Sequence, residues 1–324
     1  MTAPARSLLY LSDRDLARLD LAPEQARAAI EQALGFAPGD VFAVPKLNLP
    51  IRDGDFFQAM PAASRTLGLA LVKWIGVMAA PPPGLPNVNA LVILSDLAGG
   101  QPVALLAANR ITALRTAAMS AIAARHLARA DSAVIAFIGT GVQARSHREA
   151  LQAFFPGLTR ALLFGRTPAA VAAFAEETRV AGLACEICAD ARQAVADADI
   201  VVSSVPAGAD FKAFLDGAWL KPGAFAAMVD LGRSWRRETI SDFDVMATDD
   251  RTQSNILAAE GKLAHAGPWP ADLADFVAGR HPGRTGARQR TGFVFAGMAL
   301  ADLAVAALAY RRALAASIGT RLEA

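Results

Sequence analysis

The stretch Ser132-Ala-Val-Ile-Ala-Phe-Ile-Gly-Thr-Gly-Val-Gln-Ala144 decides the fold. Residues 133–138 form a continuous apolar run, which is typical of a strand buried on both faces of a parallel sheet. The next six residues match the pattern G-x-G-x-x-A and open a predicted helix from about Gln143 to Phe155. A strand, a glycine-rich turn and a helix in this order are the context in which this pattern indicates a dinucleotide-binding site.

Each position of this motif has a physical task. Gly139 permits the tight turn, Gly141 lets the backbone approach a pyrophosphate, and Ala144 keeps the helix close to the strand. The helix N-terminus offers unpaired N–H groups and a partial positive charge to phosphates. The alternative is a glycine turn that binds no ligand. The residues that we predict to contact a cofactor here are Gly139, Thr140, Gly141, Val142, Gln143 and Ala144.

Strands and helices alternate after this motif. Predicted strands at 160–164, 183–188 and 200–204 are separated by predicted helices at 168–181 and 191–198. Further strands lie near 225–229 and 244–247. This βαβαβ alternation predicts an α/β fold with a Rossmann-type, doubly wound parallel sheet, which we place at residues 131–290.

The end of the second predicted strand bears on the choice of cofactor. An acidic residue there would accept the ribose hydroxyls of NAD, but the chain has Gly165, Arg166 and Thr167. A guanidinium and a hydroxyl can instead bind a 2′-phosphate, which favours NADP over NAD. The alternatives for Arg166 are a solvated loop charge and stacking on adenine. After the fourth strand we expect three further residues beside the cofactor: Ser203, Ser204 and Val205.

The remainder of the chain predicts a second, α+β domain. Residues 1–130 contain a helix at 23–34, an alanine-rich helix at 108–129 and strand-like runs joined by turns, which predicts a mostly antiparallel sheet. The long final helix, residues 297–318, has the same alanine- and leucine-rich texture. We therefore expect it to pack on the first domain, which makes residues 1–130 and 291–324 one discontinuous domain.

The composition excludes several classes of protein. Of 324 residues, 54% are hydrophobic and 19% charged, which excludes disorder for most of the chain. No window of about 18 apolar residues is free of charge, which argues against a membrane span. A net charge of +2 leaves no electrostatic footprint for nucleic acid. The four histidines lack metal-ligand spacing, so we expect no metal.

The two cysteines bear on the compartment. Cys185 and Cys188 are too few for a disulfide scaffold and form C-x-x-C on a predicted strand, whereas a redox motif requires a helix start. The N-terminus does not read as a signal peptide. We expect a cytoplasmic protein.

Two cations lie in apolar surroundings. Lys73 is a lone lysine in the strand-like run 67–77, and burial there would lower its pKa, as suits a proton donor or a carboxylate partner. Arg115 lies on the predicted helix 108–129, whose other residues are mostly small and apolar. One interpretation is a bidentate contact with a substrate carboxylate, and the other is a structural ion pair. Trp74 and Trp235 are candidates either for the pocket lining or for the core.

Five segments in this order resemble those of the ornithine cyclodeaminase/mu-crystallin family: Leu71-Val-Lys73, Leu114-Arg-Thr-Ala-Ala-Met-Ser120, Ile138–Ala144, Asp199-Ile-Val-Val-Ser-Ser204 and Lys221-Pro-Gly223. The resemblance covers nearly the whole chain. It implies a homodimer whose discontinuous domain binds substrate and dimerises. It also implies hydride chemistry at the α-carbon of a small amino acid or cyclic imino acid.

The resemblance also implies roles for single residues. Lys73 and Arg115 match the carboxylate-binding lysine and arginine of the family. Lys46 stands where many members have an arginine; a lysine there keeps the positive charge but lacks the planar guanidinium that binds a carboxylate with two hydrogen bonds. Alignment on Glu238 places the cyclodeaminase aspartate at Gly232. Asp230, our second catalytic candidate beside Lys73, lies two residues earlier, about 7 Å along an extended chain.

The displaced aspartate favours one reaction within the family. A reductase of cyclic ketimines, such as a pyrroline-2-carboxylate reductase, needs a proton donor for the imine, which Lys73 or a water molecule can supply. An ornithine cyclodeaminase, which converts ornithine to proline and ammonia, needs a base for the amine. A dehydratase-like or racemase-like activity also stays open. The rival from another class is a non-enzymatic, NADP-binding protein of the mu-crystallin type.

Overall fold

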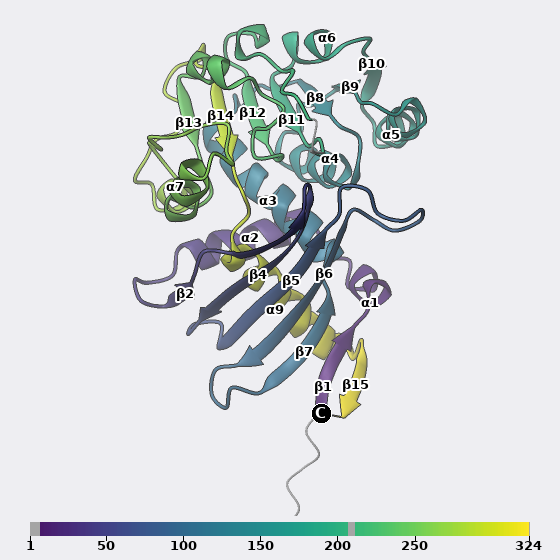
Figure 1. The fold of residues 1–324 in the computed structure, drawn as a ribbon, viewed down its shortest axis with the longest axis vertical. Coiled ribbons are helices and arrows are strands. Elements are labelled where there is room, and N and C mark those ends of the chain that lie inside the picture. The colour runs from purple at the N-terminus through teal and green to yellow at the C-terminus, as the bar shows by residue number, and fades with distance from the viewer. Residues whose placement is uncertain (1–6, 207–210, 324) are drawn as a thin grey trace, which may run out of the picture. The chain divides into compact units, whose positions relative to one another are not determined.

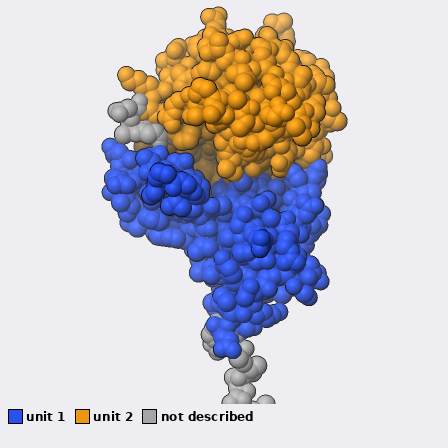
Figure 2. All heavy atoms as spheres, turned by 90° about the vertical axis from the view of Figure 1, so that its right-hand side faces the viewer, with its two compact units in different colours: residues 1–115, 298–324 blue, residues 116–297 orange. Residues whose placement is uncertain are grey.

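The computed structural model describes residues 7–206 and 211–323. The chain forms two compact units, coloured separately in Figure 2. Unit 1 comprises the described residues up to Arg115 together with those from Met298 onward, and unit 2 comprises Thr116–Gly297. The sequence placed the boundaries at 130/131 and 290/291. The compact units divide at 115/116, within helix α3 (Asn109–Leu127), and at 297/298, ahead of the last helix.

Unit 2 is built on a seven-stranded sheet in which every ladder is parallel. The strand order is β10-β9-β8-β11-β12-β14-β13. This order confirms the predicted doubly wound, Rossmann-type sheet. The order in which successive strands are added reverses between β8 and β11, although the strands themselves are parallel. The strands are β8 (Val134–Ile138), β9 (Arg160–Phe164), β10 (Ala184–Ile187), β11 (Ile200–Ser203), β12 (Phe225–Met228), β13 (Val245–Ala247) and β14 (Thr291–Val294).

Strand β14 departs from the sequence prediction. Of the seven strands it is the last along the sequence, yet it pairs with both β12 and β13. Figure 1 shows it in yellow between these two green strands. Its residues lie outside the strands predicted from the sequence. The helices of unit 2 are α4 (Val142–Phe154), α5 (Pro168–Val180), α6 (Ala191–Ala196), α7 (Arg251–Ala259) and α8 (Leu273–Val277), besides its part of α3.

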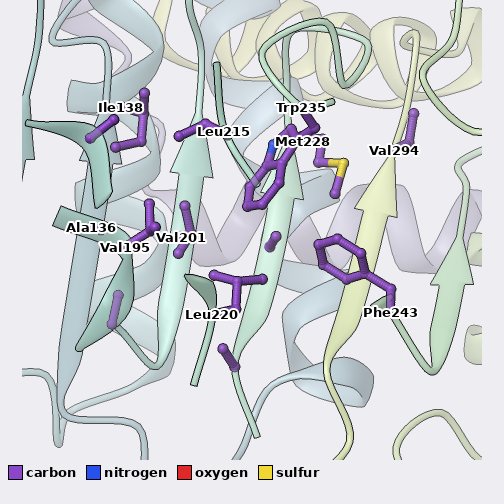
Figure 3. Close-up of a cluster of buried hydrophobic side chains, with 14 of the residues drawn as sticks. Ala136, Ile138, Val195, Val201, Leu215, Leu220, Met228, Trp235, Phe243 and Val294 are labelled. Carbon is purple, nitrogen blue, oxygen red and sulfur yellow. The ribbon is translucent and has the colours of Figure 1, made fainter. Parts of the chain in front are cut away.

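The core of unit 2 lies against this sheet. Figure 3 shows a cluster of buried side chains from neighbouring strands, including Ile138, Val201, Met228 and Val294. Trp235 packs among them with its ring edge-on to Phe243, at a centroid distance of 5.5 Å. Continuous apolar strands of this kind are buried on both faces, so they fix the strand ends and the loops that follow them.

Unit 1 is built on an eight-stranded mixed sheet in the order β15-β1-β7-β6-β5-β4-β2, with β3 paired to β4. Its ladders are antiparallel except for β1 with β7, as predicted for a mostly antiparallel sheet. The two terminal strands, β1 and β15, were not predicted. The strands are β1 (Ser7–Leu11), β2 (Val41–Ala43), β3 (Leu47–Arg52), β4 (Asp55–Ser64), β5 (Leu69–Val77), β6 (Val88–Asp96), β7 (Pro102–Ala107) and β15 (Thr320–Glu323).

Helix α9 (Ala299–Ala316) covers one face of this sheet. It packs on β4, β5 and β6 and against α2 (Pro23–Leu34), and Figure 1 shows it in yellow across the strands. The prediction that the last helix returns to the first part of the chain is therefore correct. A short helix, α1 (Asp13–Arg18), begins at Ser12, whose side chain accepts from the Asp15 N–H in a capping box.

Two absences concern the described residues alone. Within 7–206 and 211–323, no helix combines the length and the apolar character that a membrane crossing requires. The same ranges contain no group of three histidine, cysteine, aspartate or glutamate side chains that could hold a metal ion.

Candidate functional site

Strand β5 and helix α9 of unit 1 bring Lys73 to Asp302. Side chains on β5 alternate between the two faces, and Lys73 belongs to the face that α9 covers, together with Leu71 and Ile75. Its Nζ lies 2.7 Å from both carboxylate oxygens of Asp302. Both residues have 0% exposure.

Arg115 reaches the same carboxylate from α3. Its Nε lies 3.1 Å from Asp302 Oδ1, and its side chain is almost entirely buried. A buried charge is stable only when paired. Two cations converge on one carboxylate, so these three groups carry a net charge of +1 when all are ionised.

Burial, followed by the charge of Arg115, lowers the pKa of Lys73 to about 7, while Asp302 acts in the opposite direction. The direction agrees with the sequence expectation for a lysine in an apolar strand. A lysine with a pKa near neutrality can donate a proton as the ammonium and accept one as the neutral amine at physiological pH.

Lys46 is near enough to matter electrostatically. It lies between β2 and β3, is partly buried, and its charge contributes to lowering the pKa of Lys73. The three cations predicted to bind the substrate therefore all belong to unit 1, and the charges of Arg115 and Lys46 both act on Lys73.

Asp302 is the member of this cluster that sequence reasoning missed. It is the only acidic residue in α9. A lone carboxylate in a long apolar helix is a signal of the same kind as a lone lysine in an apolar strand, because both require a partner when buried. That signal was available, but only the fold reveals which cations it meets.

In unit 2 the loops after β8, β9 and β11 meet at the carboxyl edge of the sheet. Gly139 has φ +92°, and a Cβ there would lie 2.9 Å from the backbone oxygen of Ser204. A Cβ on Gly165 would lie 2.9 Å from Val171 and 3.5 Å from the Thr140 hydroxyl. These contacts bring together predicted cofactor residues from three strands, at the point where the strand order reverses.

The same edge has free space and unmet polar groups. A Cβ on Gly141 would meet nothing within 4 Å, so a ligand can approach the backbone there. Gly141 caps α4 without a side-chain hydrogen bond, and Val142 behind it is 63% exposed. The buried Ser204 Oγ and Gln143 Oε1 have no hydrogen-bond partner among the described residues. Open backbone, a free helix N-terminus and unpaired polar atoms fit a dinucleotide.

Arg166 and Thr167 lie where the sequence placed them, in the turn between β9 and α5. Both side chains are exposed. Within the ranges that the structure describes, Arg166 forms no ion pair, so its guanidinium is accessible to a ligand.

Asp230 follows β12 in unit 2 and lies in a polar network. Its oxygens accept hydrogen bonds from Ser203 Oγ (3.1 Å), the Val205 N–H (3.4 Å) and Ser234 Oγ. Trp235 Nε1 donates to the same Ser203 Oγ at 3.0 Å. Burial raises the pKa of Asp230 to about 6, against these hydrogen bonds, which lower it.

The backbone beside Asp230 bears on the reaction. Gly232 has φ +71°, and a Cβ there would lie only 2.7 Å from the Cβ of Ala264. An aspartate at position 232 would therefore need both a rare backbone conformation and a displaced neighbour. This loop does not accommodate an acid at the position that the alignment indicated.

Two other candidates behave differently from each other. Trp235 is a core residue, 1% exposed. Trp74 lies on the opposite face of β5 from Lys73 and stacks on Phe57 at a centroid distance of 5.3 Å, so it does not line the Lys73 cluster.

Cys185 and Cys188 are free thiols whose pKa values burial raises, which disfavours a reactive pair.

Comparisons with known proteins agree with this architecture. The chain is 28% identical over 328 residues to the alanine dehydrogenase of Archaeoglobus fulgidus, covering 97% of this chain and 98% of that one. The Δ1-pyrroline-2-carboxylate reductase of Thermococcus litoralis, solved with NADH and L-proline, superposes with a TM-score of 0.86 at 29% identity, covering 97% and 99%. An archaeal alanine dehydrogenase dimer with bound NAD gives 0.84 at 26%, covering 98% and 99%. The profile of the ornithine cyclodeaminase/mu-crystallin family matches residues 14–317. The chain belongs to the ornithine cyclodeaminase/mu-crystallin family.

Proposed function

We propose that this protein is a nicotinamide-dependent oxidoreductase that reduces a cyclic ketimine at its α-carbon, as a pyrroline-2-carboxylate reductase does. The observation that carries the proposal is the buried cluster of Lys73, Arg115 and Asp302, with its excess of positive charge. An apolar interior holds such an excess at a cost, which a bound carboxylate offsets. The related reductase solved with L-proline supports this substrate class.

The protein's residues have separate tasks in this reaction. A bound nicotinamide cofactor supplies the hydride. Arg115 and Lys46 attract the substrate carboxylate, and the planar guanidinium fixes its orientation. Lys73, with a pKa of about 7, provides the proton that the nitrogen of the imine requires. The loops at Gly139, Gly165 and Ser204 hold the dinucleotide.

The cofactor choice is part of the proposal. Arg166 and Thr167 favour NADP through a 2′-phosphate contact. The relatives solved with NADH or NAD support a nicotinamide cofactor in general. We assign cofactor contacts to Gly139–Ala144, Gly165–Thr167 and Ser203–Val205, residues 131–290 to dinucleotide binding, and residues 1–130 with 291–324 to substrate binding and dimerisation.

Ornithine cyclisation is the second candidate. Asp230, with a pKa raised to about 6, is ionised at neutral pH and has the character of a general base. Against this role, its oxygens already accept from two serines and one N–H. Gly232 leaves no room for an acid two residues later. These contacts favour reduction over cyclisation.

The quaternary state and compartment complete the proposal. We infer a homodimer, because unit 1 exposes large apolar side chains on the sheet face opposite α9, among them Trp74, Leu91 and Ile93, and a related alanine dehydrogenase is a dimer. The free thiols of Cys185 and Cys188 agree with a cytoplasmic location.

A spectrophotometric screen tests the function. The purified protein is incubated with NADPH or NADH and one of several cyclic ketimines, and with NADP or NAD and ornithine, lysine, alanine, proline or hydroxyprolines. We expect oxidation of the reduced cofactor with five- or six-membered cyclic ketimines. Ammonia release from ornithine would instead establish cyclisation. Cofactor binding without turnover across the whole panel would favour the non-enzymatic role.

A further inference from the structure

We infer that Asp302 is a positioning residue, which aims the Lys73 ammonium and the Arg115 guanidinium at one carboxylate-binding point and holds the proton on Lys73. The inference rests on the proposed function and extends it. Asp302 does not react with the substrate, but it sets the position and the protonation of Lys73, the proposed proton donor. Asp302 belongs to α9, whereas its two partners belong to β5 and α3.

The contacts of Lys73 fix its direction. Both carboxylate oxygens lie 2.7 Å from Nζ, so two of the three ammonium hydrogens are engaged by one side chain. The third is the one left for a substrate. Neither residue has any exposed surface, so water does not compete for this geometry.

Arg115 is held by the same group. Its Nε lies 3.1 Å from Asp302 Oδ1. Two cations that would repel each other in a dry site are kept together by the negative charge between them. Without that charge, one cation has to lose its proton or move away.

Three charged groups among the described residues shift the pKa of Lys73. Asp302 on α9 favours the protonated amine, while Arg115 on α3 and Lys46 between β2 and β3 oppose it. Asp302 is the only one of the three that stabilises the ammonium. Its removal therefore leaves two positive charges beside a desolvated amine, and the amine gives up its proton at a lower pH.

Carbon-13 NMR measures this directly. The chain has five lysines: Lys46, Lys73, Lys212, Lys221 and Lys262. Their Cε resonances, labelled with ¹³C-lysine, are few enough to assign by substitution, with K73R identifying Lys73. We expect Lys73 in the full-length protein to titrate near pH 7 and, in D302N, lower by about one pH unit or more. The readout requires no turnover.

Asp199 offers a matched control. It is a buried aspartate with a lysine partner in unit 2, with Oδ1 2.6 Å from Lys221 Nζ. Substitution D199N removes another Lys–Asp pair whose aspartate is buried, although its lysine is 32% exposed. It should leave the Lys73 titration unchanged. A shift in D199N as large as in D302N would mean that the effect is a general loss of packing, which would overturn the inference.

The pH–rate profile gives the second readout. In reduction, activity falls as pH rises through the pKa of the donor, so the midpoint of the alkaline limb should move downward in D302N. A purely structural role would scale the rate equally at every pH. The ionisation of the substrate is common to all variants, so only the difference between them counts. K73R should lack this limb, because arginine does not lose its proton in this range.

The outcomes are distinguishable. A Lys73 titration that is the same in folded D302N and in the wild type would overturn the inference, even if imine reduction is observed. Failure of the wild type to reduce any ketimine would remove the proposed function and leave the NMR test of Asp302 intact. Should D302N fail to fold, K73R decides: an alkaline limb that persists in K73R would exclude Lys73 as the group that Asp302 controls.

Discussion

Lys73 has no exposed surface, and its position in an apolar strand could be recognised from the sequence because an isolated buried charge needs a partner. The identity of that partner could not. Asp302 is separated from Lys73 by 229 positions, and only the packing of α9 on β5 brings the two together. Residue types indicated the chemistry of the site, while its geometry required the fold.

Gly232 shows a second limit at the scale of the residue. Alignment alone placed the cyclodeaminase aspartate at this position and left open whether Asp230, two residues earlier, takes its role. The structure gives the steric reason, since the Cβ of an aspartate there would come within 2.7 Å of Ala264. Close contacts of this kind depend on a distant loop and leave no trace in a local sequence pattern.

Removal of either cation should reduce catalysis strongly. We expect Lys73→Ala and Arg115→Ala each to lose ~2–4 kcal/mol of transition-state stabilisation, because charge-assisted contacts in a dry site are strong. This corresponds to about 30- to 900-fold in kcat/KM. The measurement is steady-state kinetics with the ketimine that the screen identifies. Unchanged turnover in a variant would remove that residue from the site. NADPH binding by fluorescence serves as the control for folding.

His147 should make the protein sensitive to acid. It is fully buried in α4, where Nδ1 bonds to the Gln143 carbonyl at 2.7 Å and Nε2 to Ser120 Oγ at 2.9 Å. Burial lowers its pKa from 6.5 to about 4. Between these values the unfolded chain binds a proton that the folded protein does not, so stability falls as pH drops from 6.5 towards 4.

Urea unfolding of wild type and H147N at pH 7.5 and pH 5 measures this contribution. Asparagine retains a donor for the Gln143 carbonyl but does not titrate. We expect the wild type to lose about 2 kcal/mol more than H147N between the two values. Equal losses in the two proteins would show that His147 does not control the acid sensitivity.

At the scale of the element, the predictions succeeded where a pattern was local. The parallel strands β8, β9 and β11 carry continuous apolar runs, and α2 lies within the residues predicted for it, Pro23–Leu34. Strand β14 (Thr291–Val294) was missed, because four residues after a polar stretch rich in proline and glycine give no periodicity. Only its pairing with β12 and β13 makes it a strand.

The turn after β9 should select the cofactor. If the exposed Arg166 contacts a 2′-phosphate, Arg166→Asp should reverse the preference from NADPH to NADH, because a carboxylate repels the phosphate and accepts from ribose hydroxyls. The dissociation constants of both cofactors, measured by fluorescence titration, test this. Arg192→Asp, at an exposed position on α6, is the matched control. Equal affinity ratios in the wild type and Arg166→Asp would refute the assignment.

At the scale of the whole molecule, the exposed face of the unit 1 sheet should mediate dimerisation. Trp74 is 45% exposed there, and Leu91 lies opposite it on β6. A charge at this point should prevent burial of the apolar face. We expect Trp74→Asp to convert a dimer of about 68 kDa, twice the chain mass of 33.8 kDa, into a monomer in light scattering after gel filtration.

Val180 provides the control for this experiment. It is an apolar residue, 81% exposed, at the end of α5 in unit 2. Val180→Asp adds the same charge to an apolar surface position away from the unit 1 sheet, and the dimer should persist. A wild-type protein that elutes with the mass of a single chain would contradict the proposed homodimer.

Because the chain is synthesised from its N-terminus, the late position of β14 in the sequence delays completion of its sheet. The sheet of unit 2 cannot be completed before residues 291–294 are synthesised. The sheet of unit 1 likewise needs β15, and its covering helix is α9. A nascent polypeptide that has reached residue 290 has therefore completed neither sheet, and both sheets depend on the residues that follow it.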